Sequence, residues 1–280
     1  MMASIQPPHT SEQLLVSFPA EHVLLLTLNR PKQLNAMTPQ MQNDLKQVLN
    51  WFEDEPSLWV AIVTGAGRVF CAGADLKAWN NDQQSGVTDE QEGVVANVFG
   101  FGSISRRQSK KPIIAAVNGG GAYGGGTEMV LNCDYVVAGD QAKFALPEVK
   151  RGVIAVQGGI PRLSQIAGHH LAAELLLLGR TITAAEAQGR YGFVNQVVPA
   201  SEVIPTAIAV ANEINKNSPD AVQATKRGLL LSQEYGHSQM LLAHAFASEC
   251  RGVYKGDNIK EGLKAFTEKR APRWTNPSKL

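Results

Sequence analysis

Two glutamates beside glycine-rich segments are the residues most able to carry chemistry in this chain. Glu128 lies just inside a helix that the pattern predicts after the glycine-rich segment 119–126, and Glu148 directly follows Pro147. Two carboxylates that converge on one site can divide the roles of general acid and general base. A glutamate near a helix start can also simply complement the helix dipole. The residues alone leave both interpretations open.

The glycines that precede Glu128 add a second chemical feature. Glycines at a helix start leave backbone N–H groups unscreened by side chains, and such donors stabilise an oxyanion. A second glycine turn, residues 71–75, also joins a predicted strand to a predicted helix and offers another N–H group. Two N–H donors and two carboxylates suit chemistry at a carbonyl or a thioester.

The glycine-rich segment also matches patterns of other protein classes. Gly119, Gly121 and Gly124 fit the G-x-G-x-x-G pattern of dinucleotide-binding proteins, with Asp140 as the ribose ligand. The helix that follows is short for a crossover helix, so a Rossmann-type NAD-dependent dehydrogenase is a remote alternative. The lysine of a phosphate-binding P-loop is missing after Gly126. No His or Cys spacing typical of a metal site occurs, so we expect no metal.

Hydrophobic patterning predicts the elements that must position these groups. Apolar runs predict strands over 22–29, 59–64, 112–117, 134–138 and 193–198, and Thr38 followed by Pro39 predicts a helix start. After residue 203 only helical patterns remain, including one helix over 238–250. The chain thus reads as an α/β core over residues 1–200 and a helical region over residues 201–280. Residues 80–92 have no apolar period and are predicted to form a surface loop.

Composition limits the classes of partner. The 280 residues carry a formal charge of +1, with 44% hydrophobic and 18% charged residues. This balance is typical of a globular protein and disfavours nucleic-acid or anionic-membrane partners, which usually need a basic surplus. Three scattered cysteines do not form a disulfide framework, and a reducing compartment is expected. No apolar run is long enough to predict a membrane-spanning helix.

The two ends of the sequence bear on localisation. The first residues lack the basic and apolar pattern of a secretory signal. The sequence ends in Ser278, Lys279 and Leu280, and a terminal Ser-Lys-Leu is a peroxisomal address read by an import receptor. The alternative is a frayed polar tail.

Several segments together resemble one known family. The segments that carry the likeness occur in the family's order over about residues 15–275: 29–36 (NRPKQLNA), 70–76 (FCAGADL), 111–119 (KPIIAAVNG), 124–128 (GGGTE), 144–148 (FALPE), 158–163 (GGIPRL) and 261–270 (EGLKAFTEKR). They resemble the enoyl-CoA hydratase/isomerase (crotonase) superfamily. The terminal address further suggests a peroxisomal, fungal member of the hydratase type.

The resemblance implies a fold, a substrate and catalytic residues. It implies an α/β (α+β) spiral of ββα turns with a C-terminal helical region that builds trimers, often paired into hexamers. It implies an acyl-CoA thioester substrate, with coenzyme A as part of the substrate and no separate cofactor. The family's oxyanion-hole donors fall on the backbone N–H groups of Ala74 and Gly125, and its two hydratase carboxylates fall on Glu128 and Glu148.

Further positions follow from the same resemblance. The positions that match coenzyme A contacts are Ala72, Asp75, Leu76, Lys32, Phe266 and Lys269. For Lys32 an exposed lysine beside a turn is an equally good interpretation. Phe266 and Lys269 lie near the end of the chain and are expected to reach coenzyme A from the same or a neighbouring subunit.

One segment departs from the family pattern. Past the second glutamate the family usually has Gly-x-x-Pro-Gly-x-Gly-Gly, whereas Ala155 and Val156 stand here in place of Pro-Gly. A positive φ at Val156 would strain a β-branched residue, and its side chain narrows the acyl pocket. Tyr123 is predicted to place a hydroxyl near the acyl chain. These differences leave room for a short, branched or hydroxylated acyl group.

The sequence therefore predicts reversible addition of water across the Cα–Cβ bond of an acyl-CoA. Mevalonyl-CoA hydratases of siderophore biosynthesis are relatives with a matching architecture and C-terminal signal. A double-bond isomerase on the same scaffold is the main alternative, and an RNA-binding role is the weakest.

Overall fold

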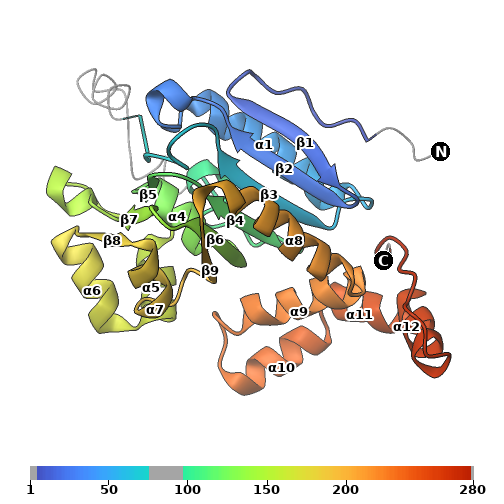
Figure 1. Ribbon diagram of the computed structural model, residues 1–280. Helices are drawn as coiled ribbons and strands as arrows, with labels where there is room; N and C mark the ends of the chain where they lie inside the picture. The colour runs from blue at the N-terminus through green and yellow to red at the C-terminus, as the bar shows by residue number, and fades with distance from the viewer. Residues whose placement is uncertain (1–4, 76–96, 279–280) are drawn as a thin grey trace.

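The computed structural model describes residues 5–75 and 97–278 (Figure 1). Leu76 and the whole of the predicted loop 80–92 lie outside the described residues, as do Lys279 and Leu280. A six-stranded sheet forms the centre, in the order β1 (Leu14–Ala20), β2 (Val23–Leu28), β3 (Val60–Gly65), β4 (Ile113–Val117), β6 (Tyr135–Gly139) and β9 (Gln196–Val198). The β1–β2 pair is antiparallel, and the remaining pairs are parallel.

Both faces of this sheet are covered by helices. On one face lies α1 (Pro39–Asp54), which buries Met41, Leu45 and Phe52 against alternate strand residues. On the other face α8 (Val203–Asn215) packs with the intervening strand residues. Burial on both faces explains why β2, β3 and β4 are continuous apolar runs. The region 201–280 thus begins with a helix that belongs to the layers around the sheet.

A smaller sheet lies beside the first and carries the glycine-rich segment. Its strands are β5 (Gly121–Tyr123), β7 (Lys143–Ala145) and β8 (Thr181–Thr183). The neighbouring helices are α4 (Gly125–Leu131), α5 (Gly159–Ala167), α6 (His169–Leu178) and α7 (Ala184–Gly189). Short 3-10 helices connect the elements: η1 (Pro31–Gln33), η2 (Phe101–Ser103), η3 (Glu148–Arg151) and η4 (Ala200–Glu202).

Four helices complete the chain: α9 (Pro219–Leu231), α10 (His237–Ala245), α11 (Ser248–Lys255) and α12 (Asn258–Thr267). They extend away from the smaller sheet in Figure 1. Lys226 of α9 anchors them to the core, because its Nζ lies 2.7 Å from Asp134 Oδ2 and donates to Lys111 O at 2.8 Å. No helix in the described parts of the chain is long and apolar enough to cross a membrane.

The sequence expectations match much of this fold. The mixed α/β class is confirmed, and Thr38 caps α1 by accepting the Met41 N–H at 3.1 Å. Strands β1, β5, β7 and β8 were not predicted. The single helix predicted over 238–250 is wrong, because Ala247 has an extended backbone (φ −63°, ψ 146°) that separates α10 from α11.

Candidate active site

The glycine-rich segment turns sharply from β5 into α4. Gly124 has φ 54°, which favours glycine, and its N–H donates to Ala145 O at 2.9 Å. The hydroxyl of Thr127 lies within hydrogen-bond distance of Ala122 O (2.8 Å) and Ala145 O (2.9 Å). These contacts fix the start of α4 against β5 and β7, so the orientation of Glu128 is set by rigid elements.

The second glycine turn runs directly against the first. Gly73 has φ 93°, and a Cβ placed on it would lie 2.9 Å from Tyr123 O and 3.6 Å from Gly125 N. Met37 bonds the two neighbours of Ala74. Its N–H donates to Gly73 O (2.9 Å), and its carbonyl accepts the Asp75 N–H (3.2 Å). The turn therefore holds Ala74 close to Gly125.

The N–H groups of Ala74 and Gly125 have no acceptor among residues 5–75 and 97–278. Backbone donors are normally satisfied in folded proteins, so two neighbouring free N–H groups are uncommon. The structure thus brings together the two groups that the sequence predicted as an oxyanion hole. Preorganised N–H donors of this kind stabilise charge that develops on a carbonyl oxygen.

Glu128 is almost fully buried, with 3% of its surface exposed. Its Oε1 accepts the Gly159 N–H at 2.9 Å, and the Gln157 N–H also bonds its carboxyl group. The pKa of Glu128 is raised to about 7, mainly by burial; the neighbouring Glu148 charge adds to the rise, whereas the two N–H groups oppose it. This carboxyl group can therefore give or take a proton near neutral pH.

Glu148 begins η3 and faces the same glycine turn. A Cβ on Gly124 would lie 3.2 Å from Glu148 Oε1, so this carboxylate sits beside the start of α4. Its Oε2 is buried and accepts no hydrogen bond from the described residues. Burial also raises the pKa of Glu148. The structure thus places both predicted glutamates at one site, next to the two free N–H groups.

Three groups at this site were not predicted from the sequence. The Phe101 ring lies against the start of α4, because a Cβ on Gly125 would be 2.5 Å from its ring carbons. Gln157 and Gly159 hold the Glu128 carboxyl group with their N–H groups. The Gly158–Gly159 pair was a detectable signal for the last two, whereas nothing near Phe101 marked it.

The segment that departs from the family pattern adopts an unstrained backbone. Val156 is not among the described residues with positive φ, so the strain considered for it is absent. Its N–H donates to Ile154 O at 3.0 Å, so it is not free to hold a water molecule. Ala155 is buried, and its Cβ would lie 3.4 Å from a Cβ on Gly159.

The Tyr123 hydroxyl lies against a backbone carbonyl, and its place beside an acyl chain stays a prediction. The hydroxyl donates to Gly120 O at 2.9 Å. The backbone carbonyl before the strand gives a half-buried phenol the partner that it needs.

The positions expected to contact coenzyme A are only partly brought together. The Ala72 N–H donates to Leu34 O at 3.0 Å, and Asp75 pairs with Arg30 at 3.3 Å, which fixes both beside the site. Lys32 is exposed on η1. The C-terminal positions lie at the end of α12, far from α4 in Figure 1, and Phe266 is 84% exposed. This chain does not bring them to its own site.

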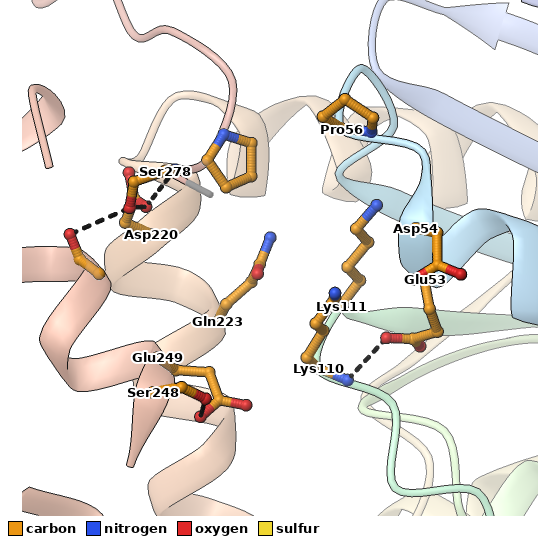
Figure 2. A pocket seen from close by; sticks show the side chains of 12 residues that line it. Glu53, Asp54, Pro56, Lys110, Lys111, Asp220, Gln223, Ser248, Glu249 and Ser278 are labelled. Atoms are coloured by element: carbon orange, nitrogen blue, oxygen red, sulfur yellow. Dashed lines mark hydrogen bonds between the residues drawn. The ribbon is translucent and has the colours of Figure 1, made fainter. Parts of the chain in front are cut away.

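Ser278 lies elsewhere, at a cavity of about 340 Å³ (Figure 2). One wall comes from the end of α1 and from Lys110 and Lys111, and the other comes from α9, α11 and the C-terminal segment. The Ser278 hydroxyl donates to Asp220 Oδ1 at 2.8 Å. Neither Glu128 nor Glu148 lines this cavity. In the described part of the chain, no group of three or more His, Cys, Asp or Glu residues is placed to hold a metal ion.

Comparisons with known proteins identify the family of the chain. The family model "Enoyl-CoA hydratase/isomerase" matches residues 19–277. An enoyl-CoA hydratase structure from Mycobacterium tuberculosis H37Rv is 36% identical with a TM-score of 0.84, and the match covers 95% of this chain and 99% of that one. The chain therefore belongs to the enoyl-CoA hydratase/isomerase family.

Curated relatives narrow the class. The mevalonyl-coenzyme A hydratase of Aspergillus fumigatus is 44% identical over 271 residues, which is 97% of each chain. The mevalonyl-coenzyme A hydratase of Beauveria bassiana is 46% identical over an alignment of 286 positions that covers 98% of this chain and 98% of that one. The carnitinyl-CoA dehydratase of Proteus mirabilis is 36% identical and covers 90% of this chain and 94% of its own. The protein is an enzyme of the hydro-lyase class, an acyl-CoA hydratase.

Proposed function

We propose that the protein interconverts mevalonyl-CoA and its dehydrated 2-enoyl thioester. The observation that carries this choice of substrate is the end-to-end similarity, at 44% and 46% identity, to two fungal mevalonyl-CoA hydratases. A branched and hydroxylated acyl group also agrees with the departure from the family pattern at Ala155 and Val156.

The site supplies the groups for this reaction. The thioester oxygen accepts the N–H groups of Ala74 and Gly125, which stabilise the enolate-like charge of the transition state. In dehydration, Glu148 takes the proton from Cα while the Cα–Cβ double bond forms. Glu128 gives a proton to the hydroxyl that leaves Cβ, and water is released. In hydration, Glu128 deprotonates the attacking water and Glu148 returns a proton to Cα.

The electrostatics of the pair suit this division of roles. Two close carboxylates resist ionising together, so one proton is shared between them over a range of pH. Glu128 has a pKa of about 7 and is more buried than Glu148, so it is the better holder of that proton. The protonated Glu128 and ionised Glu148 form is the one that dehydration needs.

We propose that coenzyme A binds along the segment that contains Ala72, Asp75 and Leu76, with Lys32 near its nucleotide end. The exposed Phe266 and the neighbouring Lys269 would reach coenzyme A from a neighbouring subunit, which supports a homotrimer or a hexamer. No separate cofactor is proposed. Mass measurement in solution by light scattering tests the assembly, and a monomer at assay concentration contradicts it.

We also propose that the protein resides in the peroxisomal matrix. The support is the Ser278-Lys279-Leu280 sequence, which an import receptor would recognise. A fluorescent protein fused ahead of the chain should co-localise with peroxisomes. Removal of the tripeptide should return it to the cytosol, and unchanged localisation would contradict the proposal.

The test of the catalytic proposal is a panel of thioesters assayed in both directions. We expect dehydration of mevalonyl-CoA with a higher kcat/KM than that of straight-chain 3-hydroxyacyl-CoA thioesters. Equal or better turnover of the straight-chain thioesters would contradict the substrate assignment. Proton exchange or double-bond migration without hydration would favour an isomerase instead.

A further inference from the structure

Gln157 occupies a fixed position directly beside the Glu128 carboxyl group. It lies in the turn before α5, and its backbone N–H bonds that carboxyl group. Its backbone carbonyl accepts a hydrogen bond from the Ser105 hydroxyl. Gly159, two residues further on, also donates its N–H to Glu128 Oε1, at 2.9 Å. The peptide of Gln157 is therefore held from both sides, at the edge of the reacting centre.

The side chain of Gln157 ends in an amide oxygen with no partner. Its Oε1 is buried and accepts no hydrogen bond from the residues that the structure describes. Buried acceptors are normally satisfied, and an orphaned one calls for an explanation. Because the backbone of this residue lies beside the Glu128 carboxyl group, a hydroxyl of the bound substrate is the candidate donor for this oxygen.

The chemistry of the site selects the kind of donor. The other free oxygen described beside the reacting centre, Glu148 Oε2, is also an acceptor. A neutral amide oxygen pairs well with a hydroxyl group. The mevalonyl group has two hydroxyls: the one on Cβ is lost to Glu128 during dehydration, and the other lies two carbons further along the chain.

We propose that Gln157 Oε1 accepts a hydrogen bond from the terminal hydroxyl of the acyl chain and so determines the specificity for a hydroxylated substrate. This inference rests on the proposed function, because it needs an acyl group whose reacting carbon lies near Glu128. A longer apolar acyl chain would leave the amide oxygen buried without a donor. The site would then disfavour that chain.

The test compares two thioesters that differ in one hydroxyl. They are mevalonyl-CoA and 3-hydroxy-3-methylpentanoyl-CoA, which lacks the terminal hydroxyl. The quantity measured is the ratio of kcat/KM for the two, because general damage to the enzyme cancels in a ratio. We expect the unaltered enzyme to favour mevalonyl-CoA by about tenfold, the effect of one hydrogen bond between neutral groups.

Gln157→Met keeps the length of the side chain and removes the acceptor, so the ratio should fall to near one. Gln157→Ala provides the same test if the methionine variant does not fold. Gln165→Met, at an exposed position on α5, is the matched control and should keep the ratio.

The outcomes separate this inference from the proposed function. If the unaltered enzyme dehydrates both thioesters equally well, or if Gln157→Met keeps the preference, the specificity role is overturned while the hydratase function stands. If the unaltered enzyme dehydrates neither thioester, the proposed function fails and takes this inference with it.

Discussion

Burial of Glu128 predicts a pH-dependent cost to stability that Glu128→Gln removes. In the folded protein its pKa is raised to about 7 from the ordinary value of 4.5. A carboxyl group with a raised pKa favours the folded state at low pH, because it stays protonated there. That contribution is lost as the pH rises from about 4.5 through 7, because the unfolded chain ionises first. The glutamine has no charge to bury, so the variant escapes this loss.

The size of the effect follows from the shift. One pKa unit corresponds to about 1.4 kcal/mol of unfolding free energy, and most of the loss in this free energy falls between pH 5 and pH 8. The free energy of unfolding of Glu128→Gln, relative to that of the unaltered protein, should therefore rise by about 2–3 kcal/mol from pH 5 to pH 8. Only 3% of the residue is exposed, so solvent screens this effect little.

The assay is urea unfolding at several pH values and one protein concentration, followed by circular dichroism. Comparing the pH dependence, not the absolute stability, removes the effect of replacing one hydrogen-bond acceptor with an amide. Glu21→Gln, an exposed glutamate, controls for the loss of one carboxylate. If the difference between Glu128→Gln and the unaltered protein stays constant from pH 5 to pH 8, Glu128 does not titrate as a buried acid and the reasoning fails.

Three further predictions concern catalysis. Glu128→Gln and Glu148→Gln should each lower kcat by several orders of magnitude while product inhibition by the thioester is kept; near-full activity in either variant would contradict the assignment. Gly125→Ala places a Cβ 2.5 Å from the Phe101 ring and should displace an oxyanion donor, with a loss of about 10²–10³ in kcat. Gly189→Ala, where a Cβ meets no atom within 4 Å, is its control and should stay fully active. In pH profiles of kcat/KM, dehydration should weaken above pH 7 and hydration below it, as Glu128 changes from acid to base; profiles without a step in this range would rule out that role.

The sequence predicted the central sheet well because its strands are buried on both faces. β2, β3 and β4 are short, mostly apolar runs without a helical period. The edge strand β1 buries only Leu14 fully, exposes Ser17 to Pro19 in a row and includes a proline, so it gave no such signal. Strands β5, β7 and β8 are each three residues long. Their pairing is set by distant segments, which patterning along the chain does not reveal.

The candidate site, like the fold, could be predicted from the sequence only in part. Glycine-rich turns and the glutamates near them are local features, so Glu128 and Glu148 could be selected from the sequence, whereas the resemblance to the family assigned Ala74 and Gly125. The direction of a side chain is not local. The hydroxyl of Tyr123 donates to the carbonyl of Gly120, a partner that the sequence pattern does not specify.

The most direct test of the catalytic pair is hydration in water enriched in ¹⁸O, with the 2-enoyl thioester as substrate and mass spectrometry of the product. The unaltered protein should place one ¹⁸O on Cβ, and Glu128→Gln and Glu148→Gln should each place almost none. Exchange of Cα hydrogen without ¹⁸O incorporation in the unaltered protein, or full incorporation by either variant, would contradict the account.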